Sequence, residues 1–294
     1  MSDERPGPTT EVRLLTVDDG RGRTIFDCLA TEEPLHIRLR AGGTTRDVAV
    51  TMRTPGHDFE LAAGFLSGEG VVRKRADIRH ISYCRDPGSG AEQRYNVVTV
   101  DLAARELPAL DALERHFATT AACGVCGKTS LVALRERGVT PVSSSIRLDA
   151  ASVLALPQRL REKQHVFAST GGLHAAGLFD GQGQLLAVRE DVGRHNALDK
   201  LLGWAFLDGR FPLANCAVAV SGRSSYELVQ KTVCAGAGAL VSVSAPSSLA
   251  VALAREFGLT LIGFTRGTRF NVYAGAERVA LDGTASVAQA RAHR

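Results

Sequence analysis

The 294-residue sequence has few of the features that membrane, secreted or disulfide-rich proteins require. Its longest apolar runs, such as residues 214–221, are far shorter than the roughly 20 residues of a membrane-spanning helix. Residues 1–10 are polar with no apolar run behind them, so we expect neither a signal peptide nor a membrane anchor there. Only six cysteines are present, which argues against a disulfide scaffold and favours a cytoplasmic protein with reduced thiols.

The sequence also lacks a strong excess of charge. It has 35 basic and 31 acidic residues, for a net charge of +4. Lysine is scarce, and the arginines are scattered along the chain without forming a basic stripe, so we expect no nucleic acid as a partner. The 45% of hydrophobic residues and 22% of charged residues are ordinary for a globular protein with a sizeable core.

The first half of the chain has the alternating pattern of half-buried strands. Residues 35–39 alternate between apolar and polar types, and residues 48–52 are again mainly apolar after a glycine turn at residues 41–43, which predicts a hairpin. Asp58 could cap a short helix through residues 61–66, and residues 95–102 predict a further strand.

The second half contains apolar runs at residues 217–221, 241–243 and 259–265, separated by helical segments. A capping box of Ser224 and Glu227 would open the first of these helices, and residues 246–256 form the second. This alternation predicts parallel βαβ units in an α/β sheet.

The change of pattern predicts the limits of two halves. We expect disordered tails at residues 1–10 and 283–294, a strand-rich half over residues 11–138, a junction at 139–150, and an α/β half over residues 151–282.

The Cys123-Gly-Val-Cys126-Gly motif is the most distinctive feature of the sequence. Its glycines give the backbone unusual freedom, and a helix starting near Lys128 would place its positive end beside the sulfurs. Both the helix end and the lysine would favour the thiolate, which is the nucleophilic form of cysteine.

Several chemistries use such a cysteine pair. Structural zinc usually needs two pairs, and only Cys123 and Cys126 are present. A zinc deaminase needs His-x-Glu and a proline before the first cysteine, where this chain has His57-x-x-Glu60 and Ala122. A thiol–disulfide oxidoreductase remains open, although no thioredoxin-like unit surrounds the motif. A carrier that accepts and passes on persulfide sulfur also remains open.

Two further regions could bind a ligand. Residues 190–200 contain Glu190, Asp191, Arg194, His195 and Lys200, which is denser than a capped amphipathic helix requires, although that interpretation remains possible. Upstream, residues 171–174 place a histidine next to two glycines.

The other region comprises loops that follow predicted strands. Residues 221–224 and 245–248 open helices there, and helix N-termini at the carboxyl ends of strands bind anions. Arg266 and Arg269 leave the third strand around a glycine and suit phosphate oxygens, unless they form an ordinary exposed loop.

In their order and spacing, these motifs resemble the FdhD family of formate dehydrogenase accessory sulfurtransferases over roughly residues 20–280. The matching motifs are TPGHDFE (54–60), GFL (64–66), CGVCG (123–127), HAAG (174–177), EDVGRHNALDK (190–200), SGRSS (221–225) and FTRGTR (264–269).

The resemblance implies a cytidine deaminase-like three-layer α/β sandwich with an N-terminal strand-rich subdomain. It implies that the protein takes persulfide sulfur from a cysteine desulfurase and delivers it to the molybdenum cofactor, Mo-bis(molybdopterin guanine dinucleotide), for formate dehydrogenase. The cofactor would be a bound substrate, and the chain would hold no tightly bound metal of its own. A homodimer is also suggested.

The resemblance assigns the persulfide to Cys123, assisted by Cys126. It implies cofactor contacts through Phe264, Thr265, Arg266, Gly267, Thr268 and Arg269, and a nucleotide pocket that includes Ser221, Gly222, Arg223, Ser224, His174 and His195. Two alternatives stay open, a cofactor-binding chaperone without sulfur chemistry and a deaminase-like zinc hydrolase.

Overall fold

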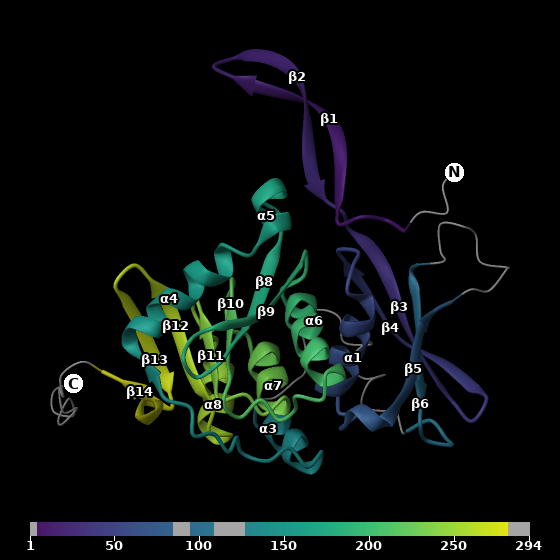
Figure 1. Ribbon diagram of the computed structural model, residues 1–294, viewed down its shortest axis with the longest axis vertical. Coiled ribbons are helices and arrows are strands. Elements are labelled where there is room, and N and C mark those ends of the chain that lie inside the picture. Colours follow the sequence, from purple (N-terminus) through teal and green to yellow (C-terminus); the bar gives the residue numbers. More distant parts are fainter. Residues whose placement is uncertain (1–4, 85–94, 109–126, 282–294) are drawn as a thin grey trace.

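The computed structural model describes residues 5–84, 95–108 and 127–281. Two sheets lie side by side with helices between and around them, and a long hairpin projects from one end (Figure 1). The fold is mixed α/β, as predicted, with a strand-rich N-terminal part. None of the helices in the described ranges combines the length and apolar composition that crossing a bilayer requires.

The N-terminal sheet has the strand order β4-β3-β6-β5. The predicted hairpin is confirmed, because β3 and β4 pair in antiparallel fashion around a turn at Gly42 and Gly43, both with positive φ. Alternate apolar residues of β3 face the helix α1 and form a core with it. The element bounds are β3 (Glu33–Ala41), β4 (Thr44–Arg53), α1 (Asp58–Gly68), β5 (Ile78–Tyr83) and β6 (Val97–Leu102).

The C-terminal sheet has the strand order β13-β12-β11-β10-β8-β9. Its central strands β10, β11 and β12 run parallel and are buried along most of their length, which confirms the predicted βαβ units. The flanking strands pair antiparallel to their neighbours. The bounds are β8 (His174–Phe179), β9 (Leu185–Asp191), β10 (Ala217–Val220), β11 (Ala239–Ser242), β12 (Thr260–Arg266) and β13 (Arg269–Ala274).

Helices cover both faces of this sheet, so this half has three layers (Figure 1). One core lies between the sheet and α6, α7 and α8, and the other lies between the sheet and α4. The bounds are α3 (Gly127–Glu136), α4 (Ala150–Arg161), α5 (His165–Thr170), α6 (Arg194–Leu207), α7 (Tyr226–Cys234) and α8 (Ser248–Glu256), with short strands β7 (Leu148–Asp149) and β14 (Val279–Ala280) at the margin.

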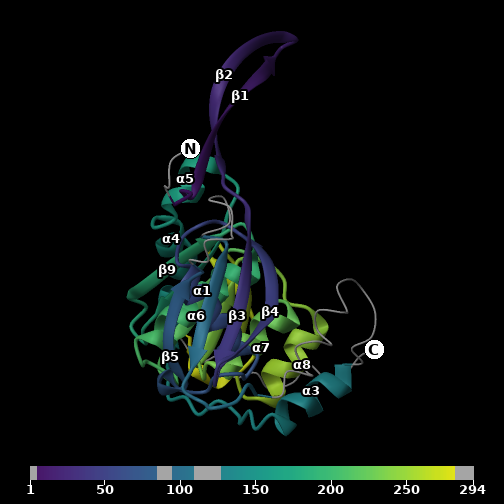
Figure 2. The same ribbon diagram turned by 90° about the vertical axis from the view of Figure 1, so that its right-hand side faces the viewer.

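The two halves meet where α1 packs against α6, which lie next to each other in Figure 2. The helix backbones touch at two glycines. A Cβ atom added at Gly203 would lie 1.8 Å from the carbonyl oxygen of Glu60, and one added at Gly64 would lie 1.9 Å from that of Asp199. Only glycine permits this approach, so the crossing depends on both residues.

The projecting hairpin consists of β1 (Thr9–Asp18) and β2 (Arg21–Ala30), joined by Asp19 and Gly20, both with positive φ. We call this hairpin the arm. Because β1 begins at Thr9, the tail predicted over residues 1–10 overlaps the strand by two residues. The other predicted limits of the two halves, and the relation to cytidine deaminases, stay predictions.

Candidate functional site

Most of the predicted binding residues lie along one edge of the C-terminal sheet, at the carboxyl ends of its parallel strands; we call it the carboxyl edge. Because β8 runs antiparallel to β10, His174 at the start of β8 lies at the same edge as Ser221 after β10. The Ser221 hydroxyl accepts a 2.9 Å hydrogen bond from the Ala175 amide, and the Ser221 amide donates to the Ala175 carbonyl at 3.0 Å. These bonds fix the loop that follows β10.

His174 lies against the backbone of this loop. A Cβ atom added at Gly222 would lie 3.5 Å from Nδ1 of His174, so the glycine backbone and the imidazole are in contact. Burial and the neighbouring Arg194 lower the pKa of His174, against the opposite effect of Asp191. The imidazole is therefore neutral at pH 7 and can serve as a hydrogen-bond partner.

His195 lies in the first turn of α6 and faces the start of α7. Its Nε2 atom is 3.3 Å from the Ser225 hydroxyl and 3.1 Å from the Glu227 carboxylate. Burial lowers the pKa of His195, and Glu227 opposes this shift. The predicted capping box of Ser224 and Glu227 is wrong. Ser225 is the N-cap, and it makes no side-chain cap, because its hydroxyl and Glu227 both face His195.

Two buried hydroxyl groups at this edge lack a hydrogen-bond partner among the described residues. Ser224 is 0% exposed and Thr265 is 1% exposed. The backbone of Ser224 is fully engaged, with its amide bonded to Ala245 and its carbonyl to Ser247. An unmet buried hydroxyl costs about 1–3 kcal/mol. A buried water or a ligand at this edge would supply the missing partners.

The segment from Phe264 to Arg269 is the third part of the edge. Phe264 has a φ of 53° and donates its amide to the Ser244 carbonyl, while Gly267 turns the chain with a φ of 58°. Arg266 and Arg269 flank the turn and are exposed, with no acidic partner among the described residues. Their guanidinium groups are therefore free to bind an anion.

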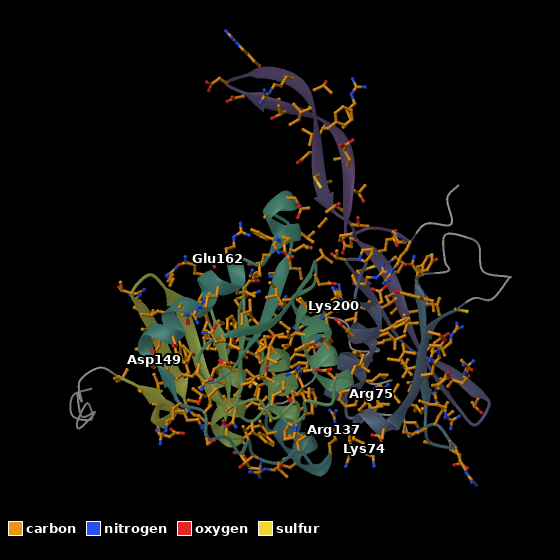
Figure 3. The ribbon with its side chains drawn as sticks, viewed as in Figure 1. Lys74, Arg75, Arg137, Asp149, Glu162 and Lys200 are labelled. Atoms are coloured by element: carbon orange, nitrogen blue, oxygen red, sulfur yellow. The ribbon has the colours of Figure 1, made fainter. Side chains whose placement is uncertain are left out.

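A buried polar cluster holds the backbone near this edge in place. The carboxylate of Asp191 is 0% exposed, lies 2.6 Å from Nζ of Lys200, and accepts hydrogen bonds from the amides of Thr54 and Gly193. Lys200, on α6, also donates to the Thr54 carbonyl at 2.7 Å, and it lies inside the molecule (Figure 3).

This cluster shows what some of the charged residues at positions 190–200 do in the structure. The N-cap of α6 is Gly193, and no side chain caps the helix. Instead, Asp191 fixes the loop that presents Arg194 and His195. Burial lowers the pKa of Lys200, and Asp191 counters that shift. The partner Thr54 was not recognised as a supporting residue from the sequence, because it lies 137 positions from Asp191.

The predicted sulfur-bearing residues Cys123 and Cys126 lie outside the described residues. The helix predicted near Lys128 is confirmed, because α3 begins at Gly127. Among the described cysteines, burial raises the pKa of Cys216 and Cys234, which keeps both thiols protonated. Within the described ranges, no group of three or more histidine, cysteine or acidic side chains is placed to hold a metal ion.

The structure thus brings the predicted binding residues to one edge, while their binding roles stay predictions. Arg223 is exposed in the loop after β10, and Thr268 lies in the turn between the two arginines.

Comparison with known proteins places the chain among its relatives. The sequence model of the FdhD/NarQ family matches residues 30–280. The chain belongs to the FdhD/NarQ family. Several named members of this family are similar to the chain in sequence. The chain is 50% identical over 279 residues to the sulfur carrier protein FdhD of Streptomyces coelicolor, covering 94% of this chain and 97% of the relative.

Two other FdhD/NarQ relatives show how far the similarity extends. Identity is 51% over 272 residues to the protein of the same name from Mycobacterium tuberculosis, covering 91% and 96% of the two chains. It is 40% over 266 residues to that of Saccharolobus solfataricus, covering 90% and 96%. A solved structure from Desulfotalea psychrophila, assigned as a formate dehydrogenase accessory protein, matches with a TM-score of 0.71 and 27% identity, covering 92% of this chain and 99% of that one.

Proposed function

We propose that this protein is a sulfurtransferase that matures formate dehydrogenase. It takes persulfide sulfur from a cysteine desulfurase onto Cys123 and passes it to the molybdenum cofactor Mo-bis(molybdopterin guanine dinucleotide), which it binds as a substrate. Membership of the FdhD/NarQ family supports the proposal, together with relatives named sulfur carrier proteins and a structural neighbour assigned as a formate dehydrogenase accessory protein.

The observation that supports cofactor binding most directly is the donor set of the carboxyl edge. The buried hydroxyls of Ser224 and Thr265 have no partner in the described chain, and Arg266 and Arg269 have no acidic neighbour there. A guanine dinucleotide offers ring atoms for the hydroxyls and a pyrophosphate for the guanidinium groups. Arg forks bind phosphate oxygens in two-point contacts, which position the ligand as well as hold it.

The sulfur step that we propose is a thiol–persulfide exchange. The Cys123 thiolate attacks the outer sulfur of the desulfurase persulfide, and the sulfur–sulfur bond of the donor breaks. The bonding pair leaves with the desulfurase thiolate, and Cys123 becomes a persulfide. Because Gly127 opens α3, the positive end of that helix follows the cysteine pair directly in sequence, which favours the attacking thiolate.

Cys126 has a distinct role in this proposal. Release of the outer sulfur as hydrosulfide requires two electrons. Attack of the Cys126 thiolate on the inner sulfur of the Cys123 persulfide supplies them, forming a Cys123–Cys126 disulfide and freeing HS⁻ for the cofactor. A cellular dithiol would then reduce the disulfide.

The remaining parts of the proposal concern the setting of the protein. We propose a cytoplasmic location, where thiols stay reduced, a homodimer, and an evolutionary relation of the C-terminal sheet to the cytidine deaminase fold. The three layers around that sheet support the relation.

The proposal is tested by the mass of the protein after incubation with a cysteine desulfurase and cysteine. The wild-type chain is expected to gain about 32 Da, the mass of one sulfur atom, on the peptide with Cys123 and Cys126. Cys123→Ala should abolish the gain. Cys216→Ala is the matched control, since burial keeps the Cys216 thiol protonated, and it should load normally.

Other outcomes would reject the proposal. A Cys123→Ala variant that loads sulfur and matures formate dehydrogenase would assign the cysteines a structural role in a cofactor-binding chaperone. Stoichiometric zinc in the purified protein would instead support a hydrolase with a metal at the cysteine pair.

A further inference from the structure

The carboxyl edge carries a carboxylate that no lysine or arginine of the described chain neutralises. Glu227 lies in the first turn of α7, and its side chain is 49% exposed. Its ion-pairing partner is His195, whose Nε2 atom lies 3.1 Å from Oε2. Because burial keeps this imidazole neutral, a proton on Nε2 can be donated to Glu227 without cancelling the negative charge. His195 therefore positions the carboxylate and leaves it able to accept hydrogen bonds from a ligand.

The other acidic residues near this edge already have partners inside the protein. Asp191 is buried against Lys200, with 2.6 Å between the carboxylate and Nζ. Glu190 accepts hydrogen bonds from the amides of Val166 and Phe167 at 3.0 and 2.8 Å. Glu227 is thus the acidic side chain best placed to meet a ligand from solvent.

Backbone hydrogen bonds join the loops after β10, β11 and β12 into one row. The amide of Ser224 donates to the Ala245 carbonyl at 3.3 Å, and the amide of Ser247 donates to the Ser224 carbonyl at 3.0 Å. In the next pair of loops, the amide of Phe264 donates to the Ser244 carbonyl at 3.1 Å. β10 and β12 are separated by one strand, so their loops lie about 10 Å apart at the usual strand spacing. This span is comparable to that of a nucleoside diphosphate from base to phosphates.

The two ends of this row carry opposite charge. Glu227 follows the loop after β10, whereas Arg266 and Arg269 flank the turn after β12 and have no acidic partner among the described residues. A phosphate group is attracted by the two arginines and repelled by the carboxylate. A nucleotide on this edge is therefore oriented with its phosphates at the arginines and its base towards Glu227.

We propose that Glu227 recognises the guanine base of the bound cofactor by accepting hydrogen bonds from its N1–H and 2-amino groups. The inference rests on the proposed cofactor binding and deepens it by naming the residue that selects guanine. The two donors are neighbours on one edge of guanine, and a carboxylate offers two acceptor oxygens to match them. Adenine has an acceptor at N1, which would face the carboxylate without a proton between them, so adenine nucleotides are rejected.

Isothermal titration calorimetry of the full-length protein with three nucleoside diphosphates tests this assignment. The wild type should bind guanosine diphosphate about 100-fold more tightly than adenosine or xanthosine diphosphate. Glu227→Gln should weaken guanosine diphosphate binding by about 10-fold, because one charge-assisted bond is lost and the glutamine amide opposes a donor. The same variant should gain affinity for xanthosine diphosphate, whose 2-oxo group accepts from the glutamine amide while its N1–H donates to the glutamine oxygen. Misfolding cannot produce such a gain.

The matched control is Glu277→Gln, which should leave all three affinities unchanged. The Glu277 side chain is 71% exposed, and the neighbouring Arg278 contacts Thr260 at the amino end of β12, away from the carboxyl edge. Guanosine diphosphate binding that is equal in the wild type and Glu227→Gln, with no gain for xanthosine diphosphate, overturns this inference and leaves the proposed cofactor binding intact. A wild-type protein that binds no guanosine diphosphate would reject both.

Discussion

Two buried carboxylates, Asp58 and Asp191, determine the positions of the residues around them. Asp58 accepts hydrogen bonds from the guanidinium of Arg53 at 3.1 and 3.3 Å and from the Tyr83 hydroxyl at 2.9 Å. Burial and the Asp58 charge raise the pKa of Tyr83 far above its ordinary value, so the phenol stays protonated and donates. Each charge is paired inside the protein, which makes removal of one partner costly.

The prediction for a single residue concerns Arg266. Arg266→Ala should weaken the binding of guanosine diphosphate by about 10-fold or more, because charge-assisted hydrogen bonds contribute about 1.5–3 kcal/mol each. Isothermal titration calorimetry measures the change. Arg79→Ala is the control, since Arg79 is an exposed arginine on β5, away from the carboxyl edge. Equal affinities in the wild type and in Arg266→Ala would reject the assignment of this residue to the nucleotide site.

At the scale of elements, the crossing of α1 and α6 connects the two halves. It depends on glycine in the middle of a helix, although glycine there is less favourable than alanine by roughly 0.5–1 kcal/mol. The close backbone contact at Gly64 and Gly203 explains why both positions lack a side chain. The two glycines lower the helix propensity of α1 and α6, but they allow the two helix backbones to pack closely.

Alanine in place of a glycine inside a helix usually stabilises a protein, but at this crossing it should destabilise it. Gly203→Ala is expected to lower the free energy of unfolding by roughly 1–3 kcal/mol, because the added Cβ atom overlaps the Glu60 carbonyl oxygen. Urea denaturation gives the value. In the control Gly172→Ala, the nearest atom to the new Cβ is 3.7 Å away, so stability should hardly change. A Gly203→Ala protein as stable as the control would show that the helices can separate without cost.

The elements that the sequence predicted are those with a strong local pattern. The buried runs of β10 and β12 and the alternation in β3 follow from residue types alone. Strands β8 and β9 were missed because their composition is ambiguous. β8 begins His-Ala-Ala-Gly, which has few strand formers, and β9 ends in Arg-Glu-Asp, which suits a helix. Their strand state comes from pairing with neighbours in the sheet.

Over the whole molecule, the candidate site could be predicted only as separate motifs. The sequence indicated His174, His195 and the loops after β10 and β12, but not that one sheet edge would hold them together. The supporting contacts could not be predicted, since Thr54 and Asp191 belong to different halves. The unpartnered hydroxyls of Ser224 and Thr265 become visible only when burial and bonding are known.

Another buried ion pair lies within the C-terminal half, and it leads to the prediction for the whole molecule. Nζ of Lys231 on α7 lies 2.9 Å from both carboxylate oxygens of Asp199 on α6, and both residues are buried. Gly68 at the end of α1 packs against the Lys231 side chain, so the pair lies where the helices of both halves meet. Burial raises the pKa of Asp199 to about 6, despite the opposing effect of Lys231.

This raised pKa makes global stability depend on pH in a defined direction. Protonated Asp199 favours the folded state fully below its unfolded pKa of about 3.9, and this contribution is lost as pH rises through about 6. In Asp199→Asn the side chain keeps its shape without the charge. The free energy of unfolding of the wild type, minus that of the variant, should therefore fall by roughly 2 kcal/mol between pH 4 and pH 7. Urea denaturation across this range measures the difference, in which the titrating groups that do not interact with Asp199 cancel. Parallel curves for the two proteins would mean that Lys231 holds Asp199 ionised throughout, so that burial does not control its titration.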